Sequence, residues 1–329
     1  MLLAAHDAIL SDLDGVVYAG PIAIEGAPQA LNRAQEAGVP VAFVTNNASR
    51  SVQAVADHLV ELGVKTDAEH VISSAQAAAE LLKAQLPAGA KVLITGAQAL
   101  ADCVAAAGLT PVSSQADEPV AVAQGFNPKI IWEDLAEAAY TLADEKVLWV
   151  ASNTDFTIPK ERGIAPGNGT LVGAVATATG RTPQVAGKPE SPIFVTAAQK
   201  LNSQRPVVVG DRLDTDIQGG NRAAMATAVV MTGVETYQSI LAAIPMERPT
   251  YILEDLNGFF EDYPQIQVQA TATGMSARGA GWSAEATDTE LTITGEGSEI
   301  DSWRVACAAW WAAHPDASAP VSPSQVHRG

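Results

Sequence analysis

The sequence predicts an α/β protein built on a doubly wound parallel sheet with helices on both faces. Short apolar runs typical of buried strands alternate along the chain with longer alanine-rich stretches typical of helices. Polar and acidic residues directly follow several of these runs, which is where such sheets carry their reactive groups. The chain has 329 residues, of which 47% are hydrophobic, so it is long enough to form two or three domains.

The first strands and helices of this pattern lie near the N-terminus. Residues 8–10 and 39–44 have the composition of strands, and residues 27–37 between them have that of a helix. The pattern resumes with an expected strand, a helix and two more strands, at residues 92–94, 97–107, 147–150 and 207–209. Because strands joined through helices run parallel, we expect their carboxyl ends to meet at one edge of a sheet.

The composition changes after Pro264, which predicts a separate C-terminal region. Gly, Ala, Thr and Ser dominate residues 271–281, and residues 290–294 alternate between polar and apolar as a strand does. A helix is expected next, because large side chains recur there every three or four positions: Ile300, Trp303, Cys307, Trp310 and His314. Four of the six tryptophans lie in this region, so we expect it to pack an aromatic face against another part of the chain. Residues from 315 onward are rich in Pro, Ser and Ala and are predicted to be disordered.

Charge and cysteine content argue against several classes of protein. The net charge of −18 disfavours a nucleic-acid or anionic-membrane partner, because phosphate groups would be repelled over most of the surface. Cys103 and Cys307 are far apart, so neither a disulfide framework nor a zinc site is predicted. The first residues lack the basic segment of a signal peptide, and no apolar run reaches the roughly 18 residues of a membrane span. We therefore expect a cytoplasmic protein.

The stretch Asp12-Leu13-Asp14-Gly15 places two carboxylates two residues apart at the end of the first expected strand. Side chains at this spacing point to the same side, so both can reach one substrate. A carboxylate nucleophile accepts a phosphoryl group, while a second acid protonates the leaving oxygen and later activates water. Gly15 permits the tight turn that follows. The same string also occurs in plain turns and in calcium-binding loops.

The stretch Thr45-Asn46-Asn47 ends the next expected strand with a hydroxyl and two amides. These groups offer neutral hydrogen-bond donors to phosphate oxygens. The alternative is a local role, in which the asparagines make a turn or cap the helix expected to begin near Ser51.

Lys188, between Gly187 and Pro189, supplies the ammonium that an acidic phosphate-binding protein requires. The proline disfavours a helical backbone at Lys188 and holds it in an extended or turn segment. The alternative is a solvated lysine on the surface.

Three carboxylates follow the expected strand at 207–209: Asp211, Asp214 and Asp216. Mg²⁺ prefers oxygen ligands, usually one or two carboxylates, waters and a phosphate oxygen, and Asp211 and Asp12 can supply the carboxylates. The alternative is an acidic helix start that interacts with the helix dipole, and the two interpretations are compatible.

In this order the four motifs resemble those of the haloacid dehalogenase-like hydrolase superfamily: D-x-D-G, a strand-terminal Thr or Ser, a Lys, and G-D-x-x-x-x-D. The two asparagines after Thr45, together with residues 151–155, are similar to motifs of class IIA, the branch of this superfamily with a large C2-type cap. That branch includes the NagD-like, p-nitrophenyl phosphate, pyridoxal phosphate and glycerol phosphate phosphatases. The resemblance covers residues 1–262.

The resemblance implies a Rossmann-like core at residues 1–75 and 183–262, with an α/β C2-type cap inserted at 76–182. The remaining residues, 263–329, form a small C-terminal α+β extension with a disordered end. Among the relatives, actinobacterial glycerol 3-phosphate phosphatases resemble the chain most, because they carry a C-terminal module of this size with an acetyltransferase-like shape. Here the module is too short for a full acetyltransferase, so we expect it to serve packing or oligomerisation. A homo-oligomer formed through the cap or the extension is therefore an expected partner.

The resemblance also implies Mg²⁺ as cofactor and a role for each motif residue. Asp12 is the nucleophile and a metal ligand, and Asp14 is the general acid/base and offers its backbone carbonyl to the metal. Asp211 is a further metal ligand, and Asp216 supports it from behind. Four residues bind phosphate: Thr45, Asn46, Asn47 and Lys188.

Together these observations predict a phosphatase that hydrolyses a small phosphate monoester through an aspartyl-phosphate on Asp12, with glycerol 3-phosphate the favoured substrate. Pyridoxal phosphate, a nucleotide and phosphoglycolate are alternative substrates. The cap selects among them, and Asn153 and Asp155 are its candidate contact residues. A phosphomutase would use the same nucleophile but exclude water during turnover. A phospholigand sensor with a partner-binding tail is a further alternative, which the intact acids disfavour.

Overall fold

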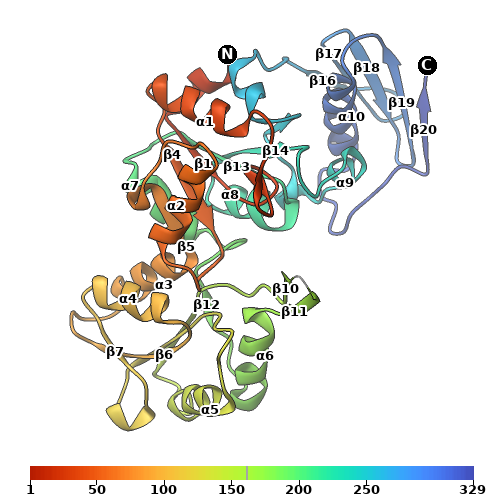
Figure 1. Cartoon of the computed structure of the whole chain (residues 1–329). Coiled ribbons are helices and arrows are strands. Elements are labelled where there is room, and N and C mark those ends of the chain that lie inside the picture. Colours follow the sequence, from red (N-terminus) through yellow and green to blue (C-terminus); the bar gives the residue numbers. More distant parts are fainter. Residues whose placement is uncertain (161) are drawn as a thin grey trace. The chain divides into compact units, whose positions relative to one another are not determined.

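The computed structural model describes residues 1–160 and 162–329, and the described chain forms two compact units (Figure 1). The first unit comprises Met1–Val41 and Ser203–Gly329, and the second comprises Ala42–Asn202. The chain passes between them twice, within β4 (Val41–Thr45) and after α7 (Pro192–Lys200). Strands and helices alternate in both units, which confirms the predicted α/β class.

Four parallel strands form the centre of the first unit. Their order is β15 (Tyr251–Leu253), β14 (Ala226–Val230), β13 (Pro206–Gly210) and β1 (Ala8–Ser11). Every residue of β1 and of β13 is buried, as expected for the inner strands of a parallel sheet. The strands pair with Ser11 opposite Val209, so β1 and β13 end at the same level. The chemistry-bearing residues that follow them therefore emerge side by side.

The remaining elements of this unit before residue 262 are short. They are a β2–β3 hairpin (Tyr18–Ala19, Ile22–Ala23), α1 (Ala27–Glu36), α8 (Gln218–Arg222) and α9 (Tyr237–Leu241). Single helical turns complete it: η1 (Leu2–Ala5), η5 (Pro245–Glu247), η6 (Leu256–Phe260) and the π-helical turn η4 (Leu213–Ile217). The expected helix at 27–37 and the expected strands at 8–10 and 207–209 are confirmed within one or two residues.

The C-terminal region folds as a five-stranded sheet covered by one helix (Figure 1). The strands lie in the order β16 (Gln267–Ala270), β17 (Met275–Gly279), β18 (Trp282–Ala286), β19 (Glu290–Gly295) and β20 (Gln325–Arg328). The helix α10 (Glu299–Ala313) packs on this sheet, and Ser298 caps its first turn. The expected strand at 290–294 and the tryptophan-bearing helix are confirmed.

The prediction of a disordered end from residue 315 onward is wrong for its last part. β20 pairs in parallel with β19, and the Trp310 indole donates to the carbonyl of Val321 at 2.8 Å. The Val321 amide in turn donates to the carbonyl of Ala242 at 3.1 Å. These partners are distant in sequence, so composition alone, which indicated disorder, carried no sign of them.

One apolar cluster joins the C-terminal region to the central sheet of the first unit. It combines Ile217, Val229 and Ile240 of the sheet layer with Trp303 and Trp310 of α10. Two arginines reinforce it by donating to backbone carbonyls. Arg304 donates to Ile252 at 2.9 and 2.7 Å, and Arg248 donates to His314 at 2.6 Å. The C-terminal region is thus an integral layer of this unit.

The second unit contains two further parallel arrangements. β4 pairs with β5 (Val71–Ser73), and a five-stranded sheet has the order β12 (Gln184–Val185), β9 (Leu148–Ala151), β8 (Ala121–Gln124), β6 (Lys91–Thr95), β7 (Thr110–Val112). A β10–β11 hairpin spans Thr157–Lys160 and Gly163–Pro166. The helices are α2 (Val52–Glu61), α3 (Ser74–Lys83), α4 (Gln98–Ala106), α5 (Trp132–Thr141), α6 (Asn168–Thr179) and α7, with single turns at η2 (Ala68–His70) and η3 (Gln115–Asp117).

Among the described residues, no helix has both the length and the apolar character that a bilayer crossing requires.

Candidate active site

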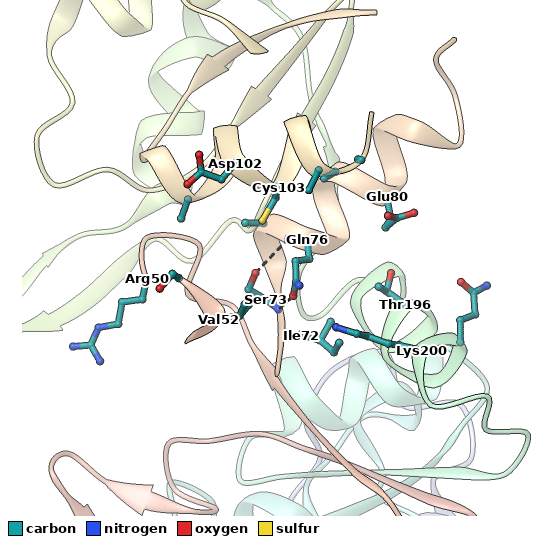
Figure 2. A pocket seen from close by; sticks show the side chains of 17 residues that line it. Arg50, Val52, Ile72, Ser73, Gln76, Glu80, Asp102, Cys103, Thr196 and Lys200 are labelled. Carbon is teal, nitrogen blue, oxygen red and sulfur yellow. Dashed lines mark hydrogen bonds between the residues drawn. The ribbon is translucent and has the colours of Figure 1, made fainter. Parts of the chain in front are cut away.

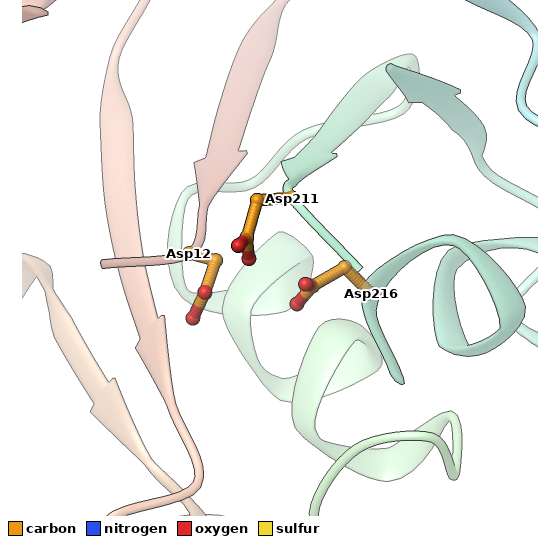
Figure 3. A group of neighbouring side chains, drawn as sticks. All are labelled: Asp12, Asp211 and Asp216. Atoms are coloured by element: carbon orange, nitrogen blue, oxygen red, sulfur yellow. The ribbon is translucent and has the colours of Figure 1, made fainter. Parts of the chain in front are cut away.

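Three carboxylates converge where β1 and β13 end (Figure 3). Asp12 directly follows β1, and its amide donates to the carbonyl of Val209 in β13 at 2.8 Å. Asp211 directly follows β13, and Asp216 lies in the π-helical turn η4. Each offers an oxygen within 4.8 Å of the oxygens of the other two. The sequence predicted the pair Asp12 and Asp211, and the structure adds Asp216 to the same cluster.

The carboxylate of Asp211 is held in a narrow slot between two glycines. Its Oδ2 accepts a hydrogen bond from the Val234 amide at 2.9 Å, and the residue is only 3% exposed. A Cβ placed on Gly15 would lie 2.2 Å from this oxygen, and one placed on Gly233 would lie 2.0 Å from it. Both positions therefore require glycine, and the packing of the two glycines restricts the Asp211 side chain.

Asp216 reaches the cluster because of the wide turn that carries it. The amides of Asp216 and Ile217 both donate to the carbonyl of Arg212, at 3.1 and 3.2 Å. Its side chain packs over Gly210, where a Cβ would lie 2.1 Å from the Cβ of Asp216. Asp216 is 1% exposed. Turns of this kind are rare and occur often at functional sites.

The third acid of this segment, Asp214, is directed elsewhere. It forms a two-point ion pair with Arg212, with N–O distances of 3.1 and 2.9 Å, and both side chains are about half exposed. Hydrogen bonding to Asp214 raises the pKa of the Arg212 guanidinium. The alternative of a solvated acidic helix start thus holds for Asp214 and not for its two neighbours in the motif.

Asp14 lies on the solvent side of the turn after Asp12. It is exposed, and Gly15 next to it has the left-handed φ of 77° that the turn requires. The Gly15 amide donates to the carbonyl of Tyr18 at 2.8 Å, and its carbonyl accepts from the Thr232 hydroxyl at 2.7 Å. Asp14 therefore lies in a turn that is fixed at Gly15, with its own side chain exposed.

The donor set of this cluster fits Mg²⁺. All its protein ligands are hard oxygen atoms, which Mg²⁺ prefers, and no nitrogen or sulfur ligand stands among them. The glycine slot also fixes the direction in which Asp211 presents its oxygens.

A second group of predicted residues meets in the second unit. The Asn46 amide donates to both carboxylate oxygens of Asp155 at 3.2 Å and to the carbonyl of Lys188 at 3.0 Å. Its Oδ1 accepts from the Lys188 amide at 2.8 Å. The Asn46 side chain is thereby bonded to both the carbonyl and the amide of Lys188, as a neighbouring strand would be. The carbonyl of Asn46 accepts from Asn153 and from Ser74, at 2.7 Å each.

Lys188 is 4% exposed, so the alternative of a solvated surface lysine is wrong. The neighbouring Gly187 permits this burial, because a Cβ there would lie 2.5 Å from the Asn46 Oδ1 and 2.5 Å from the carbonyl of Ser152. The Lys188–Pro189 peptide bond is cis.

Asn47 takes the local role that was the alternative at this motif. Its Oδ1 accepts from the amide and the hydroxyl of Ser49, at 2.9 Å each. Ser51 caps α2 by accepting from the Ala54 amide at 3.2 Å. Asn47 is exposed and so can also use its own amide toward solvent or a bound molecule.

Several residues that shape these clusters were not identified from the sequence. They are Ser74, Ser152, Thr232, Gly233, Val234 and Glu235. Three of them, Ser152, Gly233 and Val234, act through a backbone group or through the lack of a side chain, so their residue types carry no chemical signature. The pairing of Asn46 with Asp155, 109 residues apart, is likewise invisible without the fold.

Comparison with known proteins identifies the family. Residues 9–110 match the family model of haloacid dehalogenase-like hydrolases, and residues 185–259 match a second, HAD-hydrolase-like model. Residues 279–328 match a GCN5-related N-acetyltransferase-like domain. The D-glycerol 3-phosphate phosphatase of Mycobacterium tuberculosis is 44% identical over 296 residues, which cover 90% of this chain and 80% of that one.

Solved structures agree with this relationship. The glycerol phosphate phosphatase of Mycobacterium tuberculosis in complex with magnesium has a TM-score of 0.87 and 40% identity, and the match covers 100% of this chain and 95% of that one. A p-nitrophenyl phosphatase of Archaeoglobus fulgidus has a TM-score of 0.69 and 29% identity, covering 76% of this chain and 97% of that one. With its carboxylate cluster at the ends of parallel strands, the chain belongs to the haloacid dehalogenase-like hydrolases and is a phosphatase.

Proposed function

We propose that this phosphatase hydrolyses glycerol 3-phosphate with Mg²⁺ as cofactor, through an aspartyl-phosphate on Asp12. The observation that supports the chemistry is the cluster of Asp12, Asp211 and Asp216, whose oxygens lie within 4.8 Å of one another. The choice of substrate rests on the D-glycerol 3-phosphate phosphatase that is 44% identical and extends into the C-terminal region.

The reaction proceeds in two displacements at phosphorus. A carboxylate oxygen of Asp12 forms a bond to phosphorus while the bond to the ester oxygen breaks, and Asp14 gives its proton to the leaving alcohol. A water molecule then loses a proton to Asp14 and attacks the aspartyl-phosphate. That step releases inorganic phosphate and regenerates both carboxyl groups. The exposed position of Asp14 suits a group that meets the alcohol first and water second.

Mg²⁺, when bound, offsets the negative charge of the carboxylates and of the phosphoryl group. We assign its protein ligands to Asp12, Asp211 and the backbone carbonyl of Asp14. Asp216, which the same cluster includes, would support these ligands from beside them. The close packing of Gly15 and Gly233 against Asp211 supports this assignment, because a side chain whose movement is restricted is a preorganised ligand.

We assign the polar cluster of the second unit to phosphate binding. Lys188 supplies the ammonium, and Thr45 and Asn47 supply neutral donors. Asn46 has its amide bonded to Asp155 and Lys188, so we assign it to holding Lys188 in place as well as to binding phosphate.

Two cap residues were candidates for selecting the substrate. Both polar atoms of the Asn153 side chain are engaged, because its amide donates to Asn46 and its Oδ1 accepts from the Asp155 amide. We therefore propose that Asn153 supports the phosphate-binding group. Asp155 is the better candidate for a contact with a substrate hydroxyl, because its carboxylate oxygens are hydrogen-bond acceptors and it lies beside the Asn46 side chain.

The domain limits complete the proposal. The catalytic core comprises residues 1–75 and 183–262, the cap residues 76–182, and the extension residues 263–329. A cytoplasmic location and a homo-oligomer formed through the cap or the extension belong to the same proposal.

The substrate is tested by measuring kcat/KM for inorganic phosphate release from a panel of esters in the presence of Mg²⁺. The panel holds glycerol 3-phosphate, pyridoxal 5′-phosphate, a nucleoside monophosphate and 2-phosphoglycolate. We expect glycerol 3-phosphate to lead by at least about tenfold, the ratio that 1.4 kcal/mol of differential transition-state binding produces. A different leading ester would overturn the substrate, and an isomerised ester without free phosphate would identify a phosphomutase.

Replacing Asp12 with Asn tests the nucleophile. The amide is a poor nucleophile and a poor metal ligand, so we expect kcat to fall by at least about a thousandfold while the circular dichroism spectrum is retained. The matched control is Asp214→Asn, in an acid of the same motif region that lies outside the cluster and pairs with Arg212. It should stay within about threefold of the unmodified protein. Activity of Asp12→Asn within about tenfold would contradict the role of Asp12.

Replacing Gly233 with Ala tests whether Asp211 has to occupy its slot. The added Cβ would lie 2.0 Å from the Asp211 Oδ2, so the carboxylate must move. We expect kcat at saturating substrate to fall at least about tenfold, as for other changes that misplace a metal ligand. The control is Gly173→Ala, where a Cβ on α6 meets nothing within 4 Å. Equal activity of the two variants would show that the position of Asp211 is not critical.

A further inference from the structure

The loop at residues 231–236, here called the clamp loop, touches three parts of the carboxylate cluster. The Thr232 hydroxyl donates to the carbonyl of Gly15 at 2.7 Å, beside the turn that follows Asp12. The Val234 amide donates to the Asp211 carboxylate at 2.9 Å. The Glu235 carboxylate accepts from the amide of Leu213, the first residue of the turn that carries Asp216, at 3.0 Å. One short loop thus connects the supports of all three acids.

The clamp loop leads directly into α9, and α10 of the C-terminal region holds α9 at both ends. Tyr237, the first residue of α9, stacks on Trp303 with ring centroids 5.4 Å apart and planes 10° apart. Near its other end, the Trp311 indole donates to the carbonyls of Ile240 and Leu241 at 3.3 and 3.1 Å. A five-residue helix has little stability of its own, so its position depends on such contacts.

The C-terminal region is itself fixed to the strands beneath. The buried Arg304 guanidinium donates to the carbonyl of Ile252 in β15 and pairs with Asp301 at 2.7 Å. Next to it along α10, Trp303 carries the Arg328 guanidinium over its ring at 4.7 Å. Trp303, which stacks on Tyr237, is therefore held in place by its own contacts and by those of Arg304.

We propose that the C-terminal region acts as a positioning element for the metal site, with Trp303 and Glu235 as positioning residues. Trp303 fixes Tyr237 and the clamp loop, and the clamp loop fixes the Asp211 carboxylate and the turn that carries Asp216. The inference rests on the proposed function in one respect, the assignment of Asp211 as a metal ligand. It gives the acetyltransferase-like region a role in phosphatase chemistry that requires no acetyl group.

The test measures metal binding directly, by the loss of the electron paramagnetic resonance signal of free Mn²⁺, together with the Mg²⁺ dependence of kcat. Trp303→Ala and Glu235→Ala should each weaken Mn²⁺ binding by about three- to tenfold, as losses of an aromatic contact or of a supporting hydrogen bond do. High Mg²⁺ should restore kcat. Trp303→Phe and Glu235→Gln, which keep the stack and the acceptor, should recover most of the affinity. Val268→Ala, at an exposed position of β16, is the control within the same region.

The outcomes separate the inference from the proposal on which it rests. If Asp211→Asn leaves Mn²⁺ binding unchanged, the metal assignment itself is wrong. If Asp211→Asn abolishes binding while Trp303→Ala lowers only the melting temperature, the assignment stands and the C-terminal region has a packing role alone. A loss of affinity in Trp303→Ala that Trp303→Phe restores supports the inference.

An independent observation concerns a cleft of about 620 Å³ within the second unit (Figure 2). Small apolar side chains of α3 and α4 form its walls, among them Ala75, Ala79 and Ala106, with Ile72 of β5 at its base. Alanines at facing positions leave the space between the helices open. Burial raises the pKa of the Cys103 thiol, which therefore lines the cleft as a neutral group. The volume lies in the range of about 300–1,000 Å³ that small-molecule sites occupy.

The cleft lining carries two acids and two cations, and an anion can bind at the cations. Of its two acids, Glu80 is paired with Lys83 at 3.3 Å, and Asp102 accepts from the Gln98 amide at 2.8 Å. Its two cations, Arg50 and Lys200, make no ion pair within the described chain. Figure 2 shows the Lys200 side chain extending across the cleft toward Ile72. In a chain with a net charge of −18, such a site is a local exception.

We infer that this cleft binds a small amphipathic acid, with an apolar body between α3 and α4 and its acid group on Lys200. The probe is 8-anilinonaphthalene-1-sulfonate, an apolar ring system with one acid group, followed by its fluorescence. Ala106→Phe, which fills the cleft from an exposed position, should abolish one-to-one binding. Lys200→Ala should weaken it by about five- to tenfold, as the loss of one charge-assisted contact does. Lys146→Ala, on a lysine outside the cleft lining, is the control. Binding that neither cleft variant alters, or no binding, overturns the inference.

Discussion

The structure depends on the forced approach of three carboxylates that repel one another. At separations of up to 4.8 Å, two such charges repel by on the order of 3 kcal/mol at an effective dielectric constant of about 20. The fold imposes this approach through the register of β1 and β13, whose ends lie level. A divalent cation removes the repulsion, so the energy that the fold spends on gathering the acids becomes affinity for the ion. The whole protein already carries a net charge of −18, so bringing three acids together at one place is unfavourable unless a cation is bound there.

Much of the fold and of the site was predictable from the sequence. The strands that precede Asp12 and Asp211 are uninterrupted apolar runs, and such runs are readable without an alignment. The residue types proposed as oxygen ligands, nucleophile and ammonium were readable as well, because each has a distinct chemistry. The burial of Lys188 agrees with its predicted importance, although the sequence alone left a surface position open.

What the sequence could not provide are contacts that use the backbone or an absent side chain. Gly233 matters because nothing projects from it, and Val234 matters through its amide, so neither residue type signals its role. Asp216 was expected behind the metal ligands and joins their cluster, because a π-helical turn redirects it. Residues 325–328 are ordered because they pair with β19, which lies more than 30 positions earlier. Their local composition had predicted disorder instead. Apart from the local turn at Asp216, these differences have one origin, an interaction between residues far apart in the chain.

The C-terminal region shares its core with the central sheet of the first unit. Its helix shares one apolar cluster with strands of the catalytic layer, and its arginine donates to a carbonyl of that layer. Removal of the region would expose Val229 and Ile240 to water, so truncation would remove part of the core of the first unit.

The burial of Lys188 has a consequence for covalent chemistry on the protein. Amine-reactive reagents and non-enzymatic acylation modify lysines in proportion to their contact with solvent, and Lys188 has almost none. Labelling or immobilisation through lysine will thus fall on exposed residues such as Lys83, and a lysine-coupled preparation will keep the Lys188 ammonium unmodified.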